Sequence, residues 1–199
     1  MNICIFGASI TYGYYDQKMG GYVQRIRHYL ENKNKFDGQI FNLGVSGAST
    51  KDILKRFDIE AEARRPGLII FSLNTNDTQF LIKENKQRVT IKDYVKNINE
   101  LINKARKFTP NIIFIGIAAV NDNKTNPLPW ATNKVVGNKT IEKYNNTAMK
   151  ICERGKIKFI NLYSEMINLD YKSMLFDGLH PNAEGHQWMA ERIIKEINL

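Results

Sequence analysis

Short apolar runs alternate along the chain with longer segments in which apolar and polar residues are mixed. Five runs rich in Ile, Leu, Phe and Val predict strands buried on both faces, at residues 2–6, 39–43, 68–73, 111–120 and 156–162. Between them, apolar residues recur every three or four positions, as in Tyr22, Val23, Ile26 and Leu30. This spacing predicts helices that each bury one face.

Polar residues at the expected helix starts fit this pattern. We expect Thr50 to cap one helix, Thr90 and Asp93 to cap another, and the last helix to begin near Asn182. Strands that alternate with helices predict right-handed crossovers and a parallel sheet covered on both faces. The predicted fold is therefore α/β: three α/β/α layers around a doubly wound, five-stranded, flavodoxin-like sheet of order 2-1-3-4-5. Residues 1–199 are expected to form a single domain, because no repeat or linker interrupts them.

Composition adds limits on the class of protein. The chain is 43% hydrophobic and 25% charged, as in ordinary globular proteins. No apolar run approaches the roughly 20 residues of a transmembrane segment. The first residues lack a basic leader, so a cytoplasmic protein is expected, with secretion after removal of a leader left open. We expect Cys4 and Cys152 to be buried thiols rather than a disulfide.

The formal net charge of +9 raises the question of nucleic-acid binding. Lys and Arg are spread over every predicted helix, without a dense basic block or interleaved aromatic residues, and this argues against it. Attraction to anionic substrates or surfaces stays open. We expect no metal and no cofactor, because the histidines are scattered, the cysteines lack ligand spacing and the first loop lacks a glycine-rich phosphate cradle. His28 and His186 are interpreted as structural, and the oligomeric state is left open.

Residues suited to catalysis follow the first three strands and precede the last helix. Ser9, Gly47 and Asn76 follow successive strands, and Asp177 and His180 share one turn. The carboxyl ends of parallel strands lie at one edge of a sheet, so we expect these residues to meet there. Attack on a carbonyl needs a hydroxyl, a base, a group that orients the base, and donors for the oxyanion. The five residues include a candidate for each role.

Each candidate also has an ordinary structural interpretation. Ser9 and His180 are residue types that commonly cap helices or lie in turns, Asn76 is typical of a turn, and Gly47 can simply supply backbone freedom. In the catalytic interpretation, His180 is the base and Asp177 orients its ring. Asn76 offers a side-chain amide, and Gly47 a backbone N–H, to the oxyanion.

Four blocks together resemble the SGNH/GDSL hydrolase family, and they occur in the family's order between residues 7 and 181. They are Gly7-Ala8-Ser9-Ile10-Thr11-Tyr12-Gly13, Asn42-Leu43-Gly44-Val45-Ser46-Gly47, Asn74-Thr75-Asn76-Asp77 and Asp177-Gly178-Leu179-His180-Pro181. The resemblance implies Ser9 as nucleophile, with His180 and Asp177 completing a triad. It also implies an oxyanion hole made by the N–H groups of Ser9 and Gly47 and the side chain of Asn76. Two residues depart from the family pattern: Ala8 replaces an Asp and Asn74 replaces a Gly.

The implied activity is hydrolysis of small-molecule carboxylic esters through an acyl-enzyme. The alternatives are a carbohydrate O-deacetylase of the same family and a non-catalytic binding module on a degenerate hydrolase fold, the latter suggested by Ala8 and Asn74. The segments 78–89 and 121–136 are expected to border the cleft. Candidates for the substrate pocket are Tyr12, Tyr14, Asn74 and Trp130. The sequence leaves both the acyl group and the alcohol undetermined.

Overall fold

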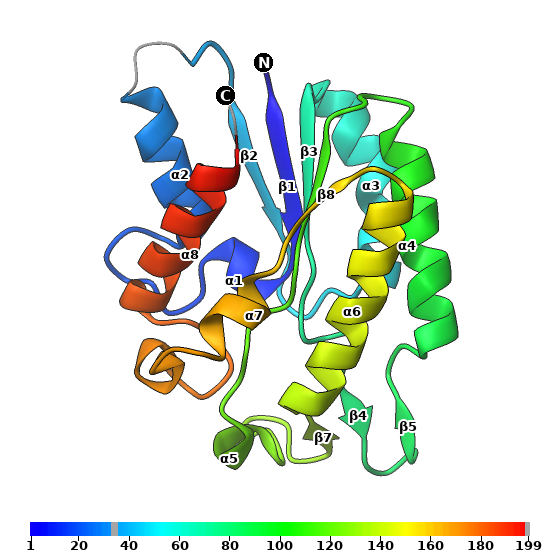
Figure 1. Ribbon diagram of the computed structural model, residues 1–199, viewed down its shortest axis with the longest axis vertical. Coiled ribbons are helices and arrows are strands. Elements are labelled where there is room, and N and C mark those ends of the chain that lie inside the picture. Colours follow the sequence, from blue (N-terminus) through cyan, green and yellow to red (C-terminus); the bar gives the residue numbers. More distant parts are fainter. Residues whose placement is uncertain (33–35, 198–199) are drawn as a thin grey trace.

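A five-stranded parallel sheet forms the centre of the molecule, in a computed structural model that describes residues 1–32 and 36–197 (Figure 1). Its strands are β1 (Ile3–Gly7), β2 (Ile40–Gly44), β3 (Leu68–Ser72), β6 (Ile112–Ile115) and β8 (Lys158–Ile160). They are arranged in the order β2-β1-β3-β6-β8. Numbered in turn, this is the predicted order 2-1-3-4-5, and the doubly wound fold class is confirmed.

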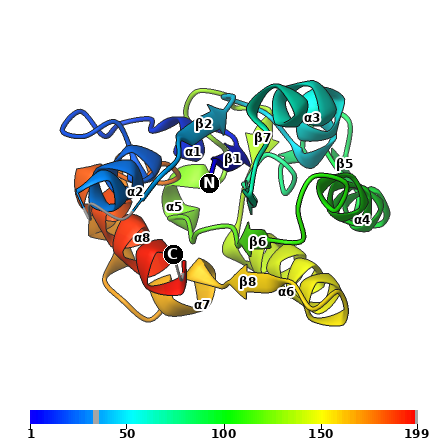
Figure 2. The same cartoon turned by 90° about the horizontal axis from the view of Figure 1, so that it is seen from above.

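Helices cover both faces of this sheet, as Figure 2 shows. On one face α2 (Tyr22–Glu31) packs against α8 (Ala183–Glu196). On the other, α4 (Ile91–Ala105) lies between α3 (Thr50–Arg64) and α6 (Asn138–Arg154). Short helical turns complete the connections: α1 (Ser9–Tyr12), α5 (Asp122–Thr125), α7 (Leu162–Met166) and the 3-10 turn η1 (Tyr171–Met174).

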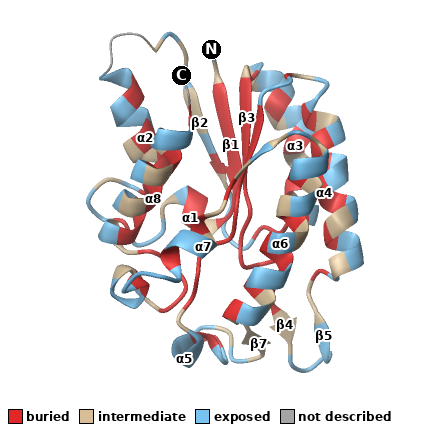
Figure 3. Ribbon diagram, in the orientation of Figure 1, coloured by how far each residue is buried: buried red, intermediate tan, exposed pale blue. Residues whose placement is uncertain are grey.

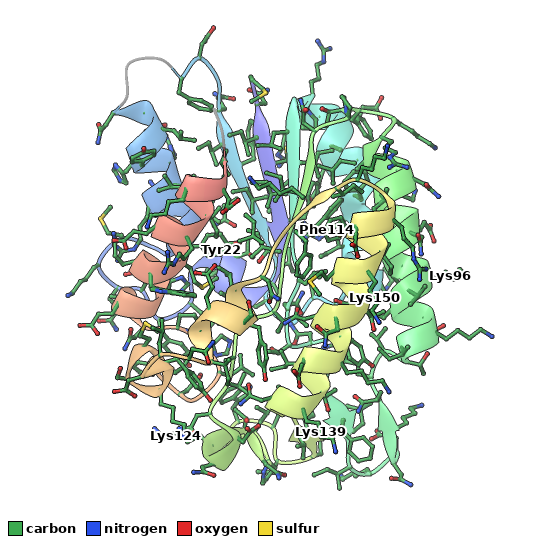
Figure 4. The ribbon with its side chains drawn as sticks, viewed as in Figure 1. Tyr22, Lys96, Phe114, Lys124, Lys139 and Lys150 are labelled. Carbon is green, nitrogen blue, oxygen red and sulfur yellow. The ribbon has the colours of Figure 1, made fainter. Side chains whose placement is uncertain are left out.

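Burial follows this layering (Figure 3). Every residue of β1 and β3 is buried, which explains why their sequences read as uninterrupted apolar runs. The rings of Phe6, Phe57 and Phe71 form one cluster, with centroids 5.0 to 5.7 Å apart. In Figure 4, Tyr22 and Phe114 lie within the molecule, and both are fully buried. The labelled lysines of that figure, which are exposed, are spread over α4, α5 and α6.

Two local predictions need correction. The N-cap of α3 is Ser49 and not Thr50, because the Asp52 carboxylate accepts both the N–H and the hydroxyl of Ser49, at 3.1 and 2.7 Å. The fourth strand ends at Ile115 instead of continuing to residue 120. Beyond it, side-chain amides of α6 replace a strand partner: Asn145 Oδ1 accepts the N–H of Ile117 (2.8 Å) and Asn138 Oδ1 that of Val120 (3.0 Å). The predicted cap Thr90 and the predicted start of the last helix near Asn182 are confirmed.

A second, small antiparallel sheet lies beyond the carboxyl ends of the large one (Figure 1). Its strands are β4 (Phe80–Leu81), β5 (Lys86–Gln87) and β7 (Lys134–Val135), in the order β5-β4-β7. Two-residue strands are too short to give a periodic pattern, so the sequence did not predict them. They belong to the segments 78–89 and 121–136, and they form an outer wall at this edge of the fold.

The cysteines are free and buried, as expected. Burial raises the pKa of both Cys4 and Cys152 to about 12, so both thiols stay protonated at neutral pH. Among the helices that the structure describes, none has the length and apolar character needed to cross a membrane.

Candidate active site

The loop after β1 and the turn before α8 meet at the carboxyl edge of the sheet. Ser9 Oγ lies 2.9 Å from Nε2 of His180, although the two residues are 171 positions apart. On the other side of the ring, Nδ1 lies 2.7 Å from Oδ2 of Asp177. The structure thus joins a hydroxyl, an imidazole and a carboxylate in one line of hydrogen bonds.

The sequence around Ser9 explains how the hydroxyl is presented. Ser9 begins the single turn of α1 directly after β1, and the N–H of Tyr12 closes that turn on the carbonyl of Ala8 at 2.8 Å. A Cβ at Gly7 would lie only 2.0 Å from Oγ1 of Thr11. Glycine is therefore required for the chain to turn this tightly from strand to helix. The turn leaves Ser9 partly exposed at the edge of the sheet.

Asp177 is held by its own turn so that one oxygen is reserved for His180. Its Oδ1 accepts the N–H groups of Leu179 and His180, at 2.9 and 2.8 Å, and Oδ2 faces the ring. Burial alone would raise the pKa of Asp177, but the hydrogen bonds from the ring and backbone of His180 and from Leu179 outweigh it and lower that pKa. Asp177 is consequently ionised at neutral pH. A carboxylate only accepts, so Nδ1 of His180 carries the proton and Nε2 accepts from Ser9.

Asn76 and Gly47 lie beside this line. Asn76 donates through Nδ2 to the carbonyl of Ala48 (3.1 Å), and its Oδ1 accepts from Nε2 of Gln79 (2.9 Å). Nδ2 has two protons, so one remains available. Gly47 has φ = +78°, and a Cβ there would meet no atom within 4 Å. Glycine is favoured at this position by backbone conformation and not by lack of space.

Ser9, Gly47, Asn76 and His180 line one cavity of about 630 Å³. The segments 78–89 and 121–136 form part of its wall, as predicted. The wall is mixed. Its polar and charged side chains are Ser46, Thr75, Gln79, Glu84, Arg88, Asn133 and Lys134, and its apolar side chains include Leu81, Leu128, Ala131 and Leu179. The cavity therefore offers many hydrogen-bonding groups beside the serine.

Aromatic rings surround His180 at the mouth of this cavity. The ring centroids of Tyr14, Tyr15 and Trp130 lie 5.7, 5.5 and 5.4 Å from that of the imidazole. Tyr15 also stacks on Phe176, with centroids 4.1 Å apart. Tyr14, Tyr15 and Trp130 line the cavity yet remain exposed in part.

Two of the predicted pocket residues are not in the cavity wall. Tyr12 is 60% exposed and packs against Tyr14, because it ends α1 on the outer side of the turn. Asn74 is buried, and its Oδ1 accepts the N–H of Asn76 at 3.0 Å. Asn74 thus stabilises the turn that positions Asn76, while its Nδ2 has no partner among the described residues.

Sequence reasoning missed several residues of the site, above all Gln79 and Arg88. Arg88 Nη2 donates to the carbonyl of Gly47 at 2.9 Å, and Arg88 Nη1 donates to Oε1 of Gln79 at 3.3 Å. Both come from the segment 78–89, which lacks periodicity. The one feature of the sequence that could have pointed to Gln79 and Arg88 was their position in a segment expected to border the cleft.

Asp77, next to Asn76, is a buried carboxylate that ties two site loops together. It accepts the N–H and the hydroxyl of Thr50, at 3.0 and 2.6 Å, and so links the loop after β3 to the start of α3. Burial raises its pKa to about 6, although the hydrogen bonds from Thr50 act in the opposite direction. Within residues 1–32 and 36–197, no three His, Cys, Asp or Glu side chains gather in a way that could hold a metal ion.

Comparisons with known proteins agree with this architecture. Among curated proteins, the chain is 21% identical over 166 residues to an acetylxylan esterase of Geobacillus stearothermophilus, covering 80% of this chain and 72% of that protein. It is 20% identical over 161 residues to an arylesterase of Vibrio mimicus, covering 81% and 70%.

Among solved structures, a lipase/acylhydrolase from Enterococcus faecalis superimposes with a TM-score of 0.83 at 22% identity, covering 98% of this chain and 94% of that one. A catalytic mutant of the Geobacillus stearothermophilus acetylxylan esterase superimposes with a TM-score of 0.78 at 19% identity, covering 100% and 94%. At these identities the likeness shows a shared fold. The sequence model of the GDSL-like lipase/acylhydrolase family matches residues 5–188, nearly the whole chain, and the protein belongs to this family.

Proposed function

We propose that the protein is a serine esterase that cleaves short carboxylic esters through an acyl-enzyme. The observation that carries the proposal is the pair of hydrogen bonds at His180, one accepted from Ser9 at 2.9 Å and one donated to Asp177 at 2.7 Å. A nucleophile, a base and an orienting carboxylate at these distances make up a catalytic triad. The names of the relatives, esterases and acylhydrolases, support the same class of reaction.

In the first half-reaction Ser9 Oγ attacks the ester carbonyl carbon while its proton passes to Nε2 of His180. The Asp177 carboxylate stabilises the resulting imidazolium. Negative charge on the carbonyl oxygen is met by the N–H groups of Ser9 and Gly47 and the free proton of Asn76 Nδ2. When the C–O bond to the alcohol breaks, the alcohol oxygen takes the proton from Nε2. A water molecule then repeats the sequence on the acyl-enzyme, releasing the carboxylic acid and regenerating Ser9.

A short acyl group on a polar alcohol is the substrate that the cavity favours. A long acyl chain needs a continuous apolar channel, whereas in this cavity polar and charged groups interrupt the apolar wall. The partly exposed rings of Tyr15 and Trp130 offer faces on which a sugar ring can stack. These features favour a carbohydrate O-deacetylase as the specific form of the activity, and one relative is an acetylxylan esterase.

Hydrolysis of p-nitrophenyl acetate, butyrate and octanoate tests both parts of the proposal. We expect turnover of the acetate, a decrease in kcat/KM with chain length, and loss of activity in Ser9→Ala. The matched control is Ser173→Ala, which removes an exposed hydroxyl that donates to the carbonyl of Asp170. Unchanged activity in Ser9→Ala would overturn the esterase assignment. A preference for octanoate would overturn the short acyl specificity and with it the deacetylase form, and no acetate release from acetylated xylo-oligosaccharides would overturn the deacetylase form alone.

A further inference from the structure

Gln79 and Arg88 face each other at the end of the small sheet. β4 and β5 pair Phe80 with Gln87, and one step further the N–H of Arg88 donates to the carbonyl of Gln79 at 2.8 Å. Their side chains also meet, through Arg88 Nη1 and Gln79 Oε1 at 3.3 Å. Both line the cavity. Neither touches Ser9, His180 or Asp177 through any hydrogen bond of the described residues.

The side chains of Arg88 and Gln79 contact Gly47 and Asn76, the two candidate oxyanion donors other than Ser9. Arg88 Nη2 donates to the carbonyl of Gly47 (2.9 Å), and Gln79 Nε2 donates to Oδ1 of Asn76 (2.9 Å). Asn76 Nδ2 in turn donates to the carbonyl of Ala48 (3.1 Å). The contacts close a ring that runs from the loop at Gly47 through the small sheet to Asn76 and back.

The direction of each hydrogen bond in this ring is fixed from both ends. A guanidinium only donates, so Arg88 requires the oxygen of the Gln79 amide to face it. The nitrogen of Gln79 must then face Asn76, which requires Asn76 to present its oxygen to Gln79. At the other end the carbonyl of Ala48 only accepts, and it requires the nitrogen of Asn76. Asn76 therefore turns an N–H, and never its oxygen, toward the cavity.

We infer that Gln79 and Arg88 are positioning residues that set the oxyanion hole: Arg88 restrains the Gly47 loop, and through Gln79 it fixes which atom of the Asn76 amide faces the ester carbonyl. Gly47 needs such restraint because it is exposed and has a positive φ. The ion pair between Arg88 and Asp52, at 3.4 Å, anchors the guanidinium to the first turn of α3. The inference rests on the proposed roles of Gly47 and Asn76 in ester hydrolysis.

Gln79→Glu is the sharpest single change. The carboxylate keeps its partner Arg88 but has no proton for Oδ1 of Asn76, so these oxygens repel each other. The carbonyl of Ala48 still requires the nitrogen of Asn76, so neither orientation of the Asn76 amide satisfies both neighbours and its N–H is no longer held toward the cavity. We expect kcat on p-nitrophenyl acetate to fall about 10- to 100-fold, less than the 10²–10³-fold typical for deletion of an oxyanion donor. KM is expected to change less than threefold. Arg88→Met is expected to lower kcat in the same way.

Introducing Gln79→Glu into the Asn76→Ala variant distinguishes a positioning role of Gln79 from a general loss of structure. Gln79 acts only through Asn76, so in that background Gln79→Glu is expected to change kcat less than twofold. The control for Arg88→Met is Arg106→Met, since Arg106 Nη2 also donates to a backbone carbonyl, that of Gly155 at 3.0 Å, but follows α4 far from the cavity. It is expected to keep the wild-type kcat.

The outcomes distinguish this inference from the proposed function. A wild-type enzyme that is inactive on the ester panel, or a Ser9→Ala variant that stays active, would overturn the proposed function. An active wild-type enzyme that is impaired by Asn76→Ala but keeps its kcat in Gln79→Glu would overturn the positioning inference alone. An equal loss from Gln79→Glu in the presence and absence of Asn76 would also overturn it, because the loss would then come from elsewhere.

Discussion

Asp177→Asn tests the tautomer on which the proposed mechanism depends. In the wild-type turn, Oδ1 of Asp177 accepts two backbone N–H groups, at 2.9 and 2.8 Å, while Oδ2 accepts the proton of His180 Nδ1 at 2.7 Å. After the substitution, the N–H groups of Leu179 and His180 still need an acceptor, so the oxygen of the new amide takes the place of Oδ1. The new NH₂ group must then face Nδ1, which has to give up its proton in order to accept.

The proton of the ring then resides on Nε2, so the ring no longer accepts the proton of Ser9. In a serine protease the equivalent substitution lowers kcat about 10⁴-fold, which corresponds to roughly 5.5 kcal/mol of transition-state stabilisation. We expect a loss of the same order in kcat/KM on p-nitrophenyl acetate at pH 8. Because the substituted side chain is nearly isosteric, the fold should be kept, as judged by circular dichroism and the urea midpoint.

The matched control is Asp170→Asn. Asp170 is exposed, and although it precedes η1, its side chain makes no capping hydrogen bond. This variant is expected to keep wild-type activity. Activity of Asp177→Asn within tenfold of the wild type would show that the ring does not depend on the carboxylate for its tautomer.

Three further changes test other parts of the structure. Asp77 has a pKa raised to about 6 from 3.8, so its carboxylate destabilises the folded state increasingly as the pH rises from about 4 to 6. In urea titrations, the unfolding free energy of Asp77→Asn relative to wild type should therefore grow by about 3 kcal/mol over that range, and a difference independent of pH would contradict this. Burial lowers the pKa of His186, which accepts the N–H of Tyr22 through Nδ1 and contacts the carbonyl of Tyr14 through Nε2, so this residue destabilises the folded state as the pH drops below 6.5. The unfolding free energy of His186→Gln relative to wild type should therefore rise as the pH falls below 6.5, and a difference that does not depend on pH would contradict this. Gly47→Ala should cost about 1 kcal/mol of stability because φ is +78°, and should lower kcat more than tenfold; wild-type kcat would show that this loop does not shape the oxyanion hole.

The sequence predicted the large sheet because its signals were local and repeated. β1 and β3 are buried along their whole length, and a strand buried on both faces is what an uninterrupted apolar run predicts. The meeting of Ser9 and His180 followed from topology, since parallel strands end at one edge and the last helix starts there. The order of the motifs and the order of the strands thus led to the same cluster of residues.

The parts that were missed depend on contacts that no local pattern encodes. The small sheet has two-residue strands, and the importance of Gln79 and Arg88 arises only from their partners Asn76 and Gly47. Tyr12 was expected in the pocket because of its ring and its neighbour Ser9. The single turn of α1 points it outward instead, and it is 60% exposed.

Labelling by a fluorophosphonate probe shows directly whether Ser9 is an activated nucleophile, because the probe reacts with a serine only where a base has activated the hydroxyl. We expect stoichiometric modification of the wild-type protein, mapped by peptide mass spectrometry to Ser9, and none in Ser9→Ala. We also expect strongly slowed labelling in His180→Ala, since Nε2 lies 2.9 Å from Ser9 Oγ and is the base. An unmodified wild-type protein would instead indicate a non-catalytic binding module on a hydrolase fold.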